Sequence, residues 1–535
     1  MRIARILEAI DGRGYKNYKK LLGLREEYRD VLLEFVKIQS DPYAPPSIAK
    51  LSMRLPEQLS PWARLWKPLS DIIARRLYKL LQRASKKVGE GYSGYLGIPR
   101  PSPIVIARSS VVVRSSRIEA RVRIGLPSKR RRILASEAIE LIYERLIPAF
   151  IKAVHVELSD VKRAISLWRD QEHIRAILPK LRLVAFVGDG SILPRKCSGC
   201  YEPLDDAIPF ESPSSLRVEL ELPSGRMITG MGIPRGIFMV MGSAFHGKTT
   251  LLEAIAEGVW NHIEGDGREF VITVRDAVIV RSEQGRRVSC VDISPFIHDL
   301  PSGQSTHNFT TNDASGATSA AAAIQEAIEL GSSLLLLDED NVSSNILYKD
   351  PIASKMIRWH TVTPLTELAR QIVAKGVSLI LVSQGTSQLI GIADNIIVME
   401  AYRPIFLGSF KDNVVSHGSR ELGYERPKPR RLNVVRLVKP RIRGMHLYAR
   451  NLEAPIDLSA NIQLVEEAQF KSLEKLVAII HKYNGRLLRE VALDIEENLA
   501  KGFFEKVFGE TIGPELGEVR AQDVAFLINR IPWRC

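Results

Sequence analysis

The sequence has little of what would place it outside ordinary globular proteins. Its 535 residues include four cysteines, too few for a disulfide scaffold, so the reducing cytoplasm is the expected compartment. It has no run of about 18 apolar residues, which excludes a membrane-spanning helix. The first residues lack the sustained apolar stretch of a secretory signal. With 45% apolar and 25% charged residues, wholesale disorder is excluded too, and the length predicts two or three domains.

Acidic residues are scarce at the N-terminal end. Residues 1–150 contain 30 Lys and Arg against 14 Asp and Glu, a net charge of +16. The rest of the chain contains 45 against 47, a net charge of −2, so the first 150 residues account for the overall +14. Such localised positive charge indicates a polyanion partner, RNA or DNA, although a solvated arginine-rich surface would have the same composition.

The basic and aromatic residues of this region lie in a few short segments. Residues 70–87 have the pattern of a helix with a basic face, and residues 89–97 form a glycine-rich loop with two tyrosines. Strands are predicted at 104–113 and 117–124, the second with a charged face, and helices at 135–154 and 159–177. A basic, proline-rich connector occupies residues 425–446. The candidate nucleic-acid contacts are Arg75, Arg76, Lys79, Arg83, Tyr92, Tyr95, Arg121, Arg123, Lys129, Arg130, Arg131, Arg132, Lys428, Arg430 and Arg431.

The pattern of apolar residues changes near residue 183. From there to about residue 400, short apolar runs that end in glycine-rich turns alternate with helical stretches, which is typical of an α/β fold with a mostly parallel sheet. Residues 462–529 are amphipathic and mostly helical. We therefore predict a basic α+β N-terminal domain at 1–180, an α/β domain at 181–425, and a connector with a small helical domain at 426–535.

A phosphate-binding motif lies in the α/β region. Residues 242–249 read Gly-Ser-Ala-Phe-His-Gly-Lys-Thr and fit the P-loop pattern G-x-x-x-x-G-K-[ST], between an apolar strand at 236–241 and a helix pattern at 249–260. Backbone amides at that helix start would surround ATP phosphates, Lys248 would reach the β- and γ-phosphates, and Thr249 would ligate Mg²⁺. The predicted nucleotide contacts are Gly242, Ser243, Ala244, Phe245, His246, Gly247, Lys248, Thr249 and Thr250.

A second strand supplies the acidic partners. Residues 332–339 read Ser-Ser-Leu-Leu-Leu-Leu-Asp-Glu, so an apolar strand delivers Asp338 at its C-terminal end, where ligands of α/β sheets bind. We expect Asp338 to hold the Mg²⁺ shell with Thr249. We expect Glu339 to orient and polarise the attacking water, as a catalytic residue together with Lys248.

Residues 312–319, Asn-Asp-Ala-Ser-Gly-Ala-Thr-Ser, precede an alanine-rich helix, and Ser315 lies 23 positions before Asp338. This arrangement resembles the signature motif of ATP-binding-cassette (ABC) ATPases. Physically, Ser315, Gly316 and Ala317 would form a second anion site at a helix N-terminus. The resemblance implies that residues 340–345 are the D-loop. It also places Gln384 where most transporter-type members have a histidine that contacts the γ-phosphate, so Gln384 is the third predicted catalytic residue. The Q-loop glutamine is either Gln284 or Gln304.

Six strings narrow the resemblance further, at residues 8–15, 187–194, 230–234, 244–248, 291–296 and 314–319. Together they resemble the family of predicted ATPases of the ABC class. That resemblance implies a P-loop core of ABC-ATPase type, flanked by the family's own N- and C-terminal domains. It also implies an ATPase linked to RNA or another nucleic acid rather than a transporter. The chain departs from the family in the glycine-rich loop, where Tyr92-Ser93 replaces a Lys-Ser pair.

The same resemblance implies a partner. An ABC signature completes the ATP site of another subunit, so one P-loop and one signature require two chains, and we expect an ATP-promoted, two-fold symmetric homodimer. An ATP-hydrolysing enzyme coupled to RNA or DNA, with ATP and Mg²⁺ as cofactors and no membrane or lipid partner, is the leading hypothesis. A nucleotide-switched scaffold with little turnover is the alternative, and a transport ATPase is weaker. Cys197 and Cys200 are expected to be two loop thiols.

Overall fold

The computed structural model describes residues 1–410 and 423–535, with Pro351 and Ala353 described by their backbone alone. The chain divides into two compact units. The first comprises Met1–Trp168, Glu466–Ser472 and Glu497–Glu518, and the second comprises Arg169–Val465, Leu473–Glu496 and Val519–Cys535. We predicted three consecutive domains, whereas the residues after 465 alternate between the two units.

The first unit is built on an antiparallel sheet in the order β1-β2-β3-β6-β4, with β5 also paired to β6. Its strands are β1 (Arg25–Tyr28), β2 (Val31–Lys37), β3 (Ser47–Arg54), β4 (Leu96–Gly97), β5 (Val111–Arg114) and β6 (Arg117–Ile124). A small hairpin joins β7 (Ser128–Lys129) to β8 (Arg132–Ile133). Successive side chains of β2 point to opposite faces of the sheet, so Val31, Leu33 and Phe35 all point inward, where they are buried.

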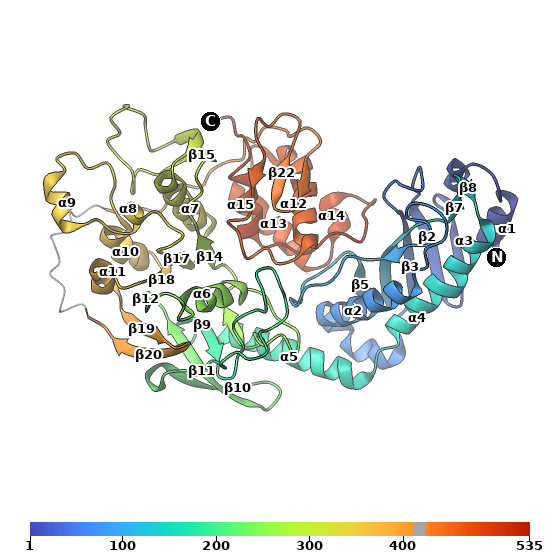
Figure 1. The fold of residues 1–535 in the computed structure, drawn as a ribbon, viewed down its shortest axis with the longest axis horizontal. Helices are drawn as coiled ribbons and strands as arrows, with labels where there is room; N and C mark the ends of the chain where they lie inside the picture. The colour runs from blue at the N-terminus through green and yellow to red at the C-terminus, as the bar shows by residue number, and fades with distance from the viewer. Residues whose placement is uncertain (411–422) are drawn as a thin grey trace. The chain divides into compact units, whose positions relative to one another are not determined.

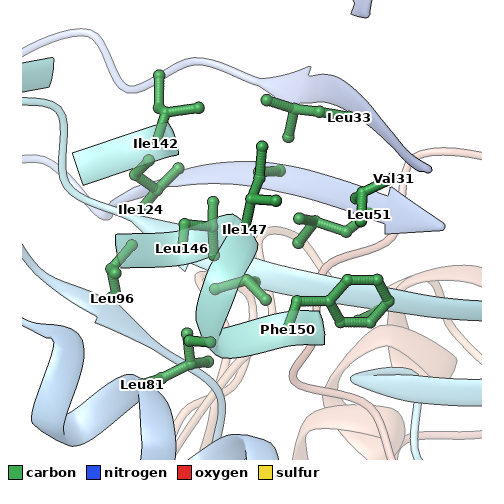
Figure 2. Close-up of a cluster of buried hydrophobic side chains, with 14 of the residues drawn as sticks. Val31, Leu33, Leu51, Leu81, Leu96, Ile124, Ile142, Leu146, Ile147 and Phe150 are labelled. Carbon is green, nitrogen blue, oxygen red and sulfur yellow. The ribbon is translucent and has the colours of Figure 1, made fainter. Parts of the chain in front are cut away.

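Helices cover one face of this sheet. α2 (Trp66–Ala84) buries Leu69, Ile73, Leu77 and Leu81, which recur every four residues, and it packs against β5 and α4 (Figure 1). Figure 2 shows the resulting core, in which side chains of β2, β3, β6 and α2 meet those of the 135–154 stretch. The other helical segments are α1 (Arg2–Ala9), η1 (Tyr15–Leu21), η2 (Glu57–Leu65), α3 (Ala135–Ile139), a π-helical turn at Glu140–Leu146, α4 (Ile147–Val154), α5 (Leu158–Ile177) and α14 (Phe504–Phe508). The helices predicted at 135–154 and 159–177 are confirmed.

The strand predicted at 104–113 is wrong in its first half. Only β5, which begins at Val111, joins the sheet. The preceding segment pairs instead with residues from the end of the chain: Arg108 forms a β-bridge with Gly517, and the Ser109 amide donates to the Leu516 carbonyl at 2.9 Å. Alternating apolar residues predict extended backbone, but they do not identify its partner.

The second unit contains a six-stranded sheet in the order β14-β17-β18-β12-β19-β20. The first five strands are parallel and only β20 runs antiparallel. The strands are β12 (Ile237–Met241), β14 (Val278–Val280), β17 (Leu334–Asp338), β18 (Ser378–Ser383), β19 (Asn395–Glu400) and β20 (Arg403–Gly408). Three of the parallel strands, β12, β17 and β18, are almost entirely buried, as expected for strands covered on both faces.

Smaller elements surround this sheet. An antiparallel sheet in the order β10-β11-β9-β13 is formed by β9 (Leu183–Gly188), β10 (Arg217–Glu221), β11 (Met227–Pro234) and β13 (Val271–Thr273), and a hairpin by β15 (Arg286–Val291) and β16 (Phe309–Ala314). The helices are α6 (Lys248–Glu257), α7 (Gly316–Leu330), α8 (Ser344–Leu347), α9 (Pro351–Met356), α10 (Leu365–Ala374) and α11 (Ser387–Ile392), with η4 at Ser214–Leu216. One face of the large sheet packs on α7 and α10 in a single hydrophobic cluster.

The C-terminal region is mostly helical, as predicted. It contains α12 (Glu467–Ile479), η6 (Ile480–Tyr483), α13 (Leu488–Ala500), α14 and α15 (Ala521–Ile528), preceded by a three-stranded sheet of β21 (Arg441–Arg443), β22 (His446–Tyr448) and β23 (Ile456–Asp457). None of the helices in the described ranges is both long and apolar enough to cross a bilayer.

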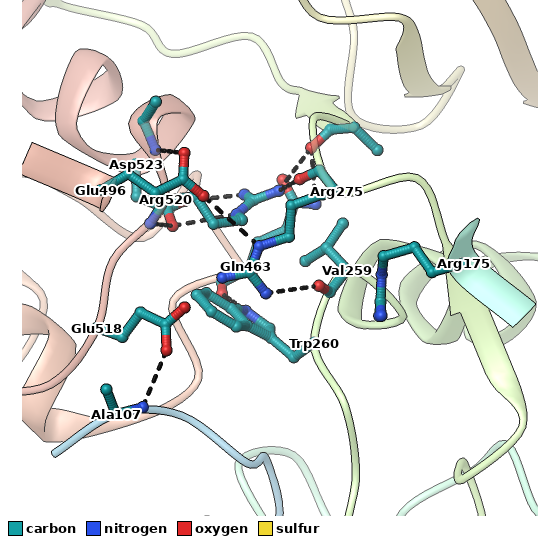
Figure 3. Close-up of polar contacts among 12 residues, drawn as sticks. Ala107, Arg175, Val259, Trp260, Arg275, Gln463, Glu496, Glu518, Arg520 and Asp523 are labelled. Carbon is teal, nitrogen blue, oxygen red and sulfur yellow. Dashed lines mark hydrogen bonds and ion pairs between the residues drawn. The ribbon is translucent and has the colours of Figure 1, made fainter. Parts of the chain in front are cut away.

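Within the second unit, buried polar contacts join the C-terminal segments to the large sheet (Figure 3). The Gln463 side chain donates to the Ala256 carbonyl at 2.9 Å and accepts from the Ile279 amide at 3.3 Å. The backbone carbonyl of Gln463 accepts from the Trp260 indole at 2.8 Å. The Arg520 guanidinium, also buried, donates to the Ala277 carbonyl at 2.8 Å. These bonds hold the end of α6 and the start of β14, two elements that flank the predicted nucleotide site.

The prediction of two loop thiols is wrong, because Cys197 and Cys200 form a disulfide and Cys290 pairs with Cys535. The sequence spacing reveals the proximity of the first pair but not of the second, whose members are 245 positions apart. Cys535 is the last residue, and Cys290 lies on β15. The second disulfide therefore fixes Cys535 to the hairpin that leads to Ser315.

We expect Cys535→Ser to destabilise the oxidised protein by about 2–4 kcal/mol, because opening a very long loop frees the unfolded chain most. Cys200→Ser is the matched control: it opens a loop with a sequence separation of 3 and should cost much less. Thermal unfolding with and without a thiol reductant measures both effects. Equal melting temperatures of wild type and Cys535→Ser without reductant would contradict the expectation.

Candidate functional site

The P-loop has the predicted strand, loop and helix. β12 ends at Met241, the loop follows, and α6 begins at Lys248. Gly247 caps α6 with φ +91°, and a Cβ on Gly242, whose φ is +140°, would lie 2.6 Å from the Met399 carbonyl oxygen. Both glycines are therefore required by their backbone and by the close approach of β19. The Lys248 ammonium is buried and donates to the Ser243 carbonyl at 2.8 Å, across the opening of the loop.

Thr249 and Asp338 converge, as predicted for a Mg²⁺ site. The Thr249 hydroxyl donates to Asp338 Oδ2 at 3.0 Å. Burial raises the pKa of Asp338, and this outweighs the hydrogen bonds from Asp340 and Thr249 that lower it. A hydroxyl and a buried carboxylate at one point are oxygen donors that suit Mg²⁺, which would in turn favour the ionised carboxylate. These two residues would hold the ion, and its chemistry would be to neutralise phosphate charge.

Glu339 is surrounded by hydrogen-bond donors. Oε1 accepts from the Tyr348 hydroxyl at 2.7 Å and the Thr386 hydroxyl at 3.0 Å. Oε2 accepts from the Ser383 hydroxyl at 2.5 Å and from the backbone amide of Gln384 at 3.2 Å. Burial raises the pKa of Glu339, but these hydrogen bonds lower it by more, so the net shift is downward. The carboxylate is thus ionised and fixed in orientation.

The strand order explains how these groups meet. β17, which ends in Asp338, is separated from the P-loop strand β12 by β18, whose last residue is Ser383. Because these strands are parallel, their C-terminal ends lie at one edge of the sheet. Gln384 directly follows β18 beside Glu339, as predicted, and its side chain is exposed. Sequence reasoning missed Tyr348, Ser383 and Thr386, which belong to no motif.

The predicted signature segment begins a helix. Ser315 caps α7 and is exposed, and its hydroxyl accepts from the Thr318 amide at 3.2 Å. A Cβ on Gly316 would lie 2.6 Å from Ser343 Oγ, so the glycine allows the predicted D-loop to approach. Ala317 is in the first turn of α7. Among the described residues, no hydrogen bond joins Ser315 or Gly316 to residues 242–250.

The two Q-loop candidates are in different places. Gln284 follows β14, the neighbour of β17, and its Oε1 accepts from the Gly316 amide at 3.2 Å. Gln304 lies between β15 and β16, where its amide donates to the Thr310 carbonyl at 3.1 Å. The structure thus connects Gln284, not Gln304, to the edge of the sheet that carries Asp338 and to the signature helix.

Three of the nucleic-acid candidates are corrected by the structure. Arg75 bonds Asp71 at 2.7 Å, buried Arg121 bonds Glu505, and Arg430 bonds Glu329 at 2.6 Å. Their guanidinium groups are ion-paired with carboxylates of the same chain, so these arginines stabilise the fold rather than bind the phosphates of a partner. Arg76 donates to the Lys152 carbonyl, and Arg123 lies 3.7 Å from Glu515. Lys428 and Arg431 are exposed.

The remaining candidates are exposed on three neighbouring segments of the first unit, and among them Arg131 lies 3.4 Å from Asp41. Lys79 and Arg83 are exposed on α2, Tyr92 and Tyr95 on the loop after it, and Lys129–Arg132 on the β7–β8 hairpin. The loop packs between the other two elements: a Cβ on Gly94 would lie 1.8 Å from the Lys86 carbonyl oxygen, and the Glu90 amide donates to the Ser128 carbonyl. We call these eight residues the basic surface.

Comparison with known proteins decides the family. A profile of the P-loop domain of ABC ATPases matches residues 157–430, and one of the N-terminal domain of ATPases of the ABC class matches residues 1–157. The chain belongs to the family of ABC-class ATPases. The predicted fold class is therefore confirmed: an ABC-type P-loop core with N- and C-terminal parts of its own.

Individual proteins add little to this assignment. The ABC-class ATPase is 33% identical over 272 residues to the uncharacterized protein MJ1628 of Methanocaldococcus jannaschii, covering 48% of this chain and 59% of that protein. The chain thus spans about three fifths of the curated relative. A solved structure, cbiO1 from Clostridium perfringens, part of the ABC transporter complex cbiONQ, is similar with a TM-score of 0.26 and 14% identity. It covers 43% of this chain and 90% of its own.

Proposed function

We propose that this ABC-class ATPase binds and hydrolyses ATP with Mg²⁺. The observation that carries the proposal is the convergence, at one sheet edge, of a P-loop lysine, a Thr249–Asp338 pair 3.0 Å apart and the ionised, oriented Glu339. In the proposed reaction Lys248 and the α6 N-terminus bind the phosphates. Glu339 accepts a proton from the attacking water, and the exposed side-chain amide of Gln384 donates a hydrogen bond to the γ-phosphate.

The active form we propose is a homodimer that sandwiches ATP. Ser315 and the first amides of α7 make an exposed helix N-terminus, which is an anion site that the described P-loop of the same chain does not contact. In a two-fold dimer that helix start would face the γ-phosphate bound to the partner. The Gly316 amide donates a hydrogen bond to Gln284 Oε1. Dimer closure would therefore require this bond to break before the amide can donate to phosphate.

The polyanion partner we propose is a single-stranded nucleic acid bound at the basic surface. Exposed lysines and arginines would neutralise phosphates, and the two half-exposed tyrosines, with ring centroids 6.1 Å apart, would stack on bases. Phosphate release with and without single-stranded RNA or DNA tests coupling to the ATPase site. A basal rate that nucleic acid leaves unchanged would favour the second candidate, a nucleotide-switched binding protein, which Gln384 in place of a histidine supports.

We expect Arg130→Asn/Arg131→Gly to weaken nucleic-acid binding and its dependence on salt. These residues form the hairpin turn with φ of 50° and 57°, values that asparagine and glycine adopt readily, so the variant removes two charges and keeps the turn. The slope of log K against log salt should become less steep by about 1.4, or about 0.7 for each lost phosphate contact.

The control for this variant is Lys162→Ala/Lys180→Ala, which removes two exposed charges elsewhere in the chain. Its salt slope should equal that of the wild type. Fluorescence anisotropy of labelled oligonucleotides at several salt concentrations measures all three proteins. Equal slopes for the hairpin variant and the control would remove the basic surface as the contact site.

A further inference from the structure

The P-loop carries an aromatic side chain where its backbone would favour glycine. Phe245 has φ +66°, a conformation that is costly for a bulky residue, and its side chain is 93% exposed. Neither packing nor backbone geometry accounts for a phenylalanine at this position. An exposed aromatic kept in a strained phosphate-binding loop is the kind of outlier that points to a ligand contact.

A second aromatic lies against the same loop from the turn between β19 and β20. Ala401 and Tyr402 form this two-residue turn with φ of 46° and 69°, again values that favour glycine or asparagine. Tyr402 is 53% exposed, and its Cδ1 lies 3.2 Å from the point where a Cβ on Gly247 would be. The Ala401 amide donates to His246 Nδ1 at 3.0 Å, which fixes the turn to the loop.

Other aromatic residues do not offer the same position. In the second unit, the remaining large aromatics exposed among the described residues are Trp359 and Tyr448. Trp359 donates to the Asp299 carbonyl, and Tyr448 ends β22. The strands before the P-loop, β10 and β11, contain no aromatic residue, and Phe210 ahead of them is buried. Phe245, within the phosphate loop, and Tyr402, against it, are therefore the exposed aromatic residues available at this loop.

We propose that Phe245 and Tyr402 form the base-binding platform of the nucleotide site and that they select purine nucleoside triphosphates. This inference rests on the proposed ATP binding. The base of a bound nucleotide lies one ribose away from the α-phosphate, so it must contact a surface beside the loop that holds the phosphates. Flat, exposed rings there can stack on a base, and the larger purine gains more from stacking than a pyrimidine does.

The test uses variants that remove each ring without straining the backbone. Phe245→Gly and Tyr402→Gly keep the left-handed conformations, since glycine adopts positive φ freely. Affinities for ATP, CTP and inorganic tripolyphosphate are measured by calorimetry on the full chain. We expect ATP affinity to fall roughly 10-fold in each variant and up to about 100-fold in the double variant, while tripolyphosphate affinity stays constant, because only ATP has a base.

Two control variants sharpen the result. Tyr402→Phe keeps the ring and should keep ATP affinity, and Tyr448→Gly removes an exposed ring away from the P-loop and should change nothing. Unchanged ATP affinity in the double glycine variant, or an equal loss for tripolyphosphate, would overturn the platform. A wild-type protein that binds ATP no better than tripolyphosphate would overturn the platform alone. Binding of neither ligand would overturn the proposed ATP site as well.

Discussion

Glu339→Gln should slow phosphate release by at least about 100-fold and leave ATP affinity nearly unchanged. A general base contributes roughly 10²- to 10⁴-fold to a rate, and an amide cannot accept the proton. The substitution preserves shape, because the hydroxyls of Tyr348 and Thr386, which bond Oε1, can rotate to accept from the new amide nitrogen, while Ser383 continues to donate to the oxygen on the other side. The backbone N–H of Gln384 can only donate, so it would keep the oxygen of the new glutamine side chain in the place of Oε2.

The same variant tests the dimer. When hydrolysis stops, ATP stays between the two half-sites, so light scattering with saturating Mg²⁺ and ATP should give twice the monomer mass for Glu339→Gln. Glu221→Gln, at an exposed position on β10, is the isosteric control and should match wild type in rate and mass. A monomer at saturating ATP would contradict the sandwich, and a wild-type rate in Glu339→Gln would remove Glu339 as the base.

The proposed role of Glu339 also sets the acid limb of the pH profile. Burial raises its pKa, but hydrogen bonds from Ser383, Tyr348 and Thr386 lower it by more, so the carboxylate stays ionised to below the usual glutamate range. The rate should therefore not fall through protonation of this group as pH decreases from 8 to 6.

The predictable part of the site is the part encoded by short segments. Strand, loop and helix follow one another within residues 236–260. The parallel sheet then brings Asp338, the last residue of β17, to Thr249, because the P-loop leaves β12 at the same edge of the sheet. The groups that orient Glu339 were not predictable, since Tyr348 and Thr386 lie in separate segments that only the folded chain brings to one carboxylate. The turn that positions Tyr402 against Gly247 was missed for the same reason.

Charge patterns were the least reliable guide to function. The alternation in residues 117–124 correctly predicted a strand, but it also suggested that Arg121 faces solvent. Glu505, almost 400 residues later, instead bonds this buried guanidinium. A sequence pattern shows where a cation is, whereas a carboxylate distant in sequence decides whether that cation is free to meet a phosphate. The exposed hairpin at Lys129–Arg132 was identifiable because its turn is local.

The final prediction concerns the buried ion network of the first unit. Arg108 is 3% exposed and bonds two carboxylates: Asp71, and Glu466 at 2.6 Å and 2.7 Å. Burial lowers the pKa of Arg108, but Glu466 and Asp71 raise it by more, so the side chain remains charged. Glu466 also accepts from the amide and the hydroxyl of Ser102. One cation thus neutralises acids from an early helix and from the C-terminal segment of the same unit.

Arg108→Met should destabilise the first unit by about 3–5 kcal/mol, because it leaves the buried Glu466 carboxylate without its cation and leaves Asp71 with Arg75 alone. Arg25→Met, which removes the exposed pair with Glu34, should cost at most about 1 kcal/mol. Arg108→Met/Glu466→Gln should recover much of the loss, since Asp71 keeps Arg75 and the main cost lies in the unpaired charge of Glu466 rather than in the missing arginine. Thermal unfolding measures the global effect, and hydrogen exchange at the Ser102 amide reports it locally. If the double variant is no more stable than Arg108→Met, the loss is one of packing, and the network would not be what joins the C-terminal segment to this unit.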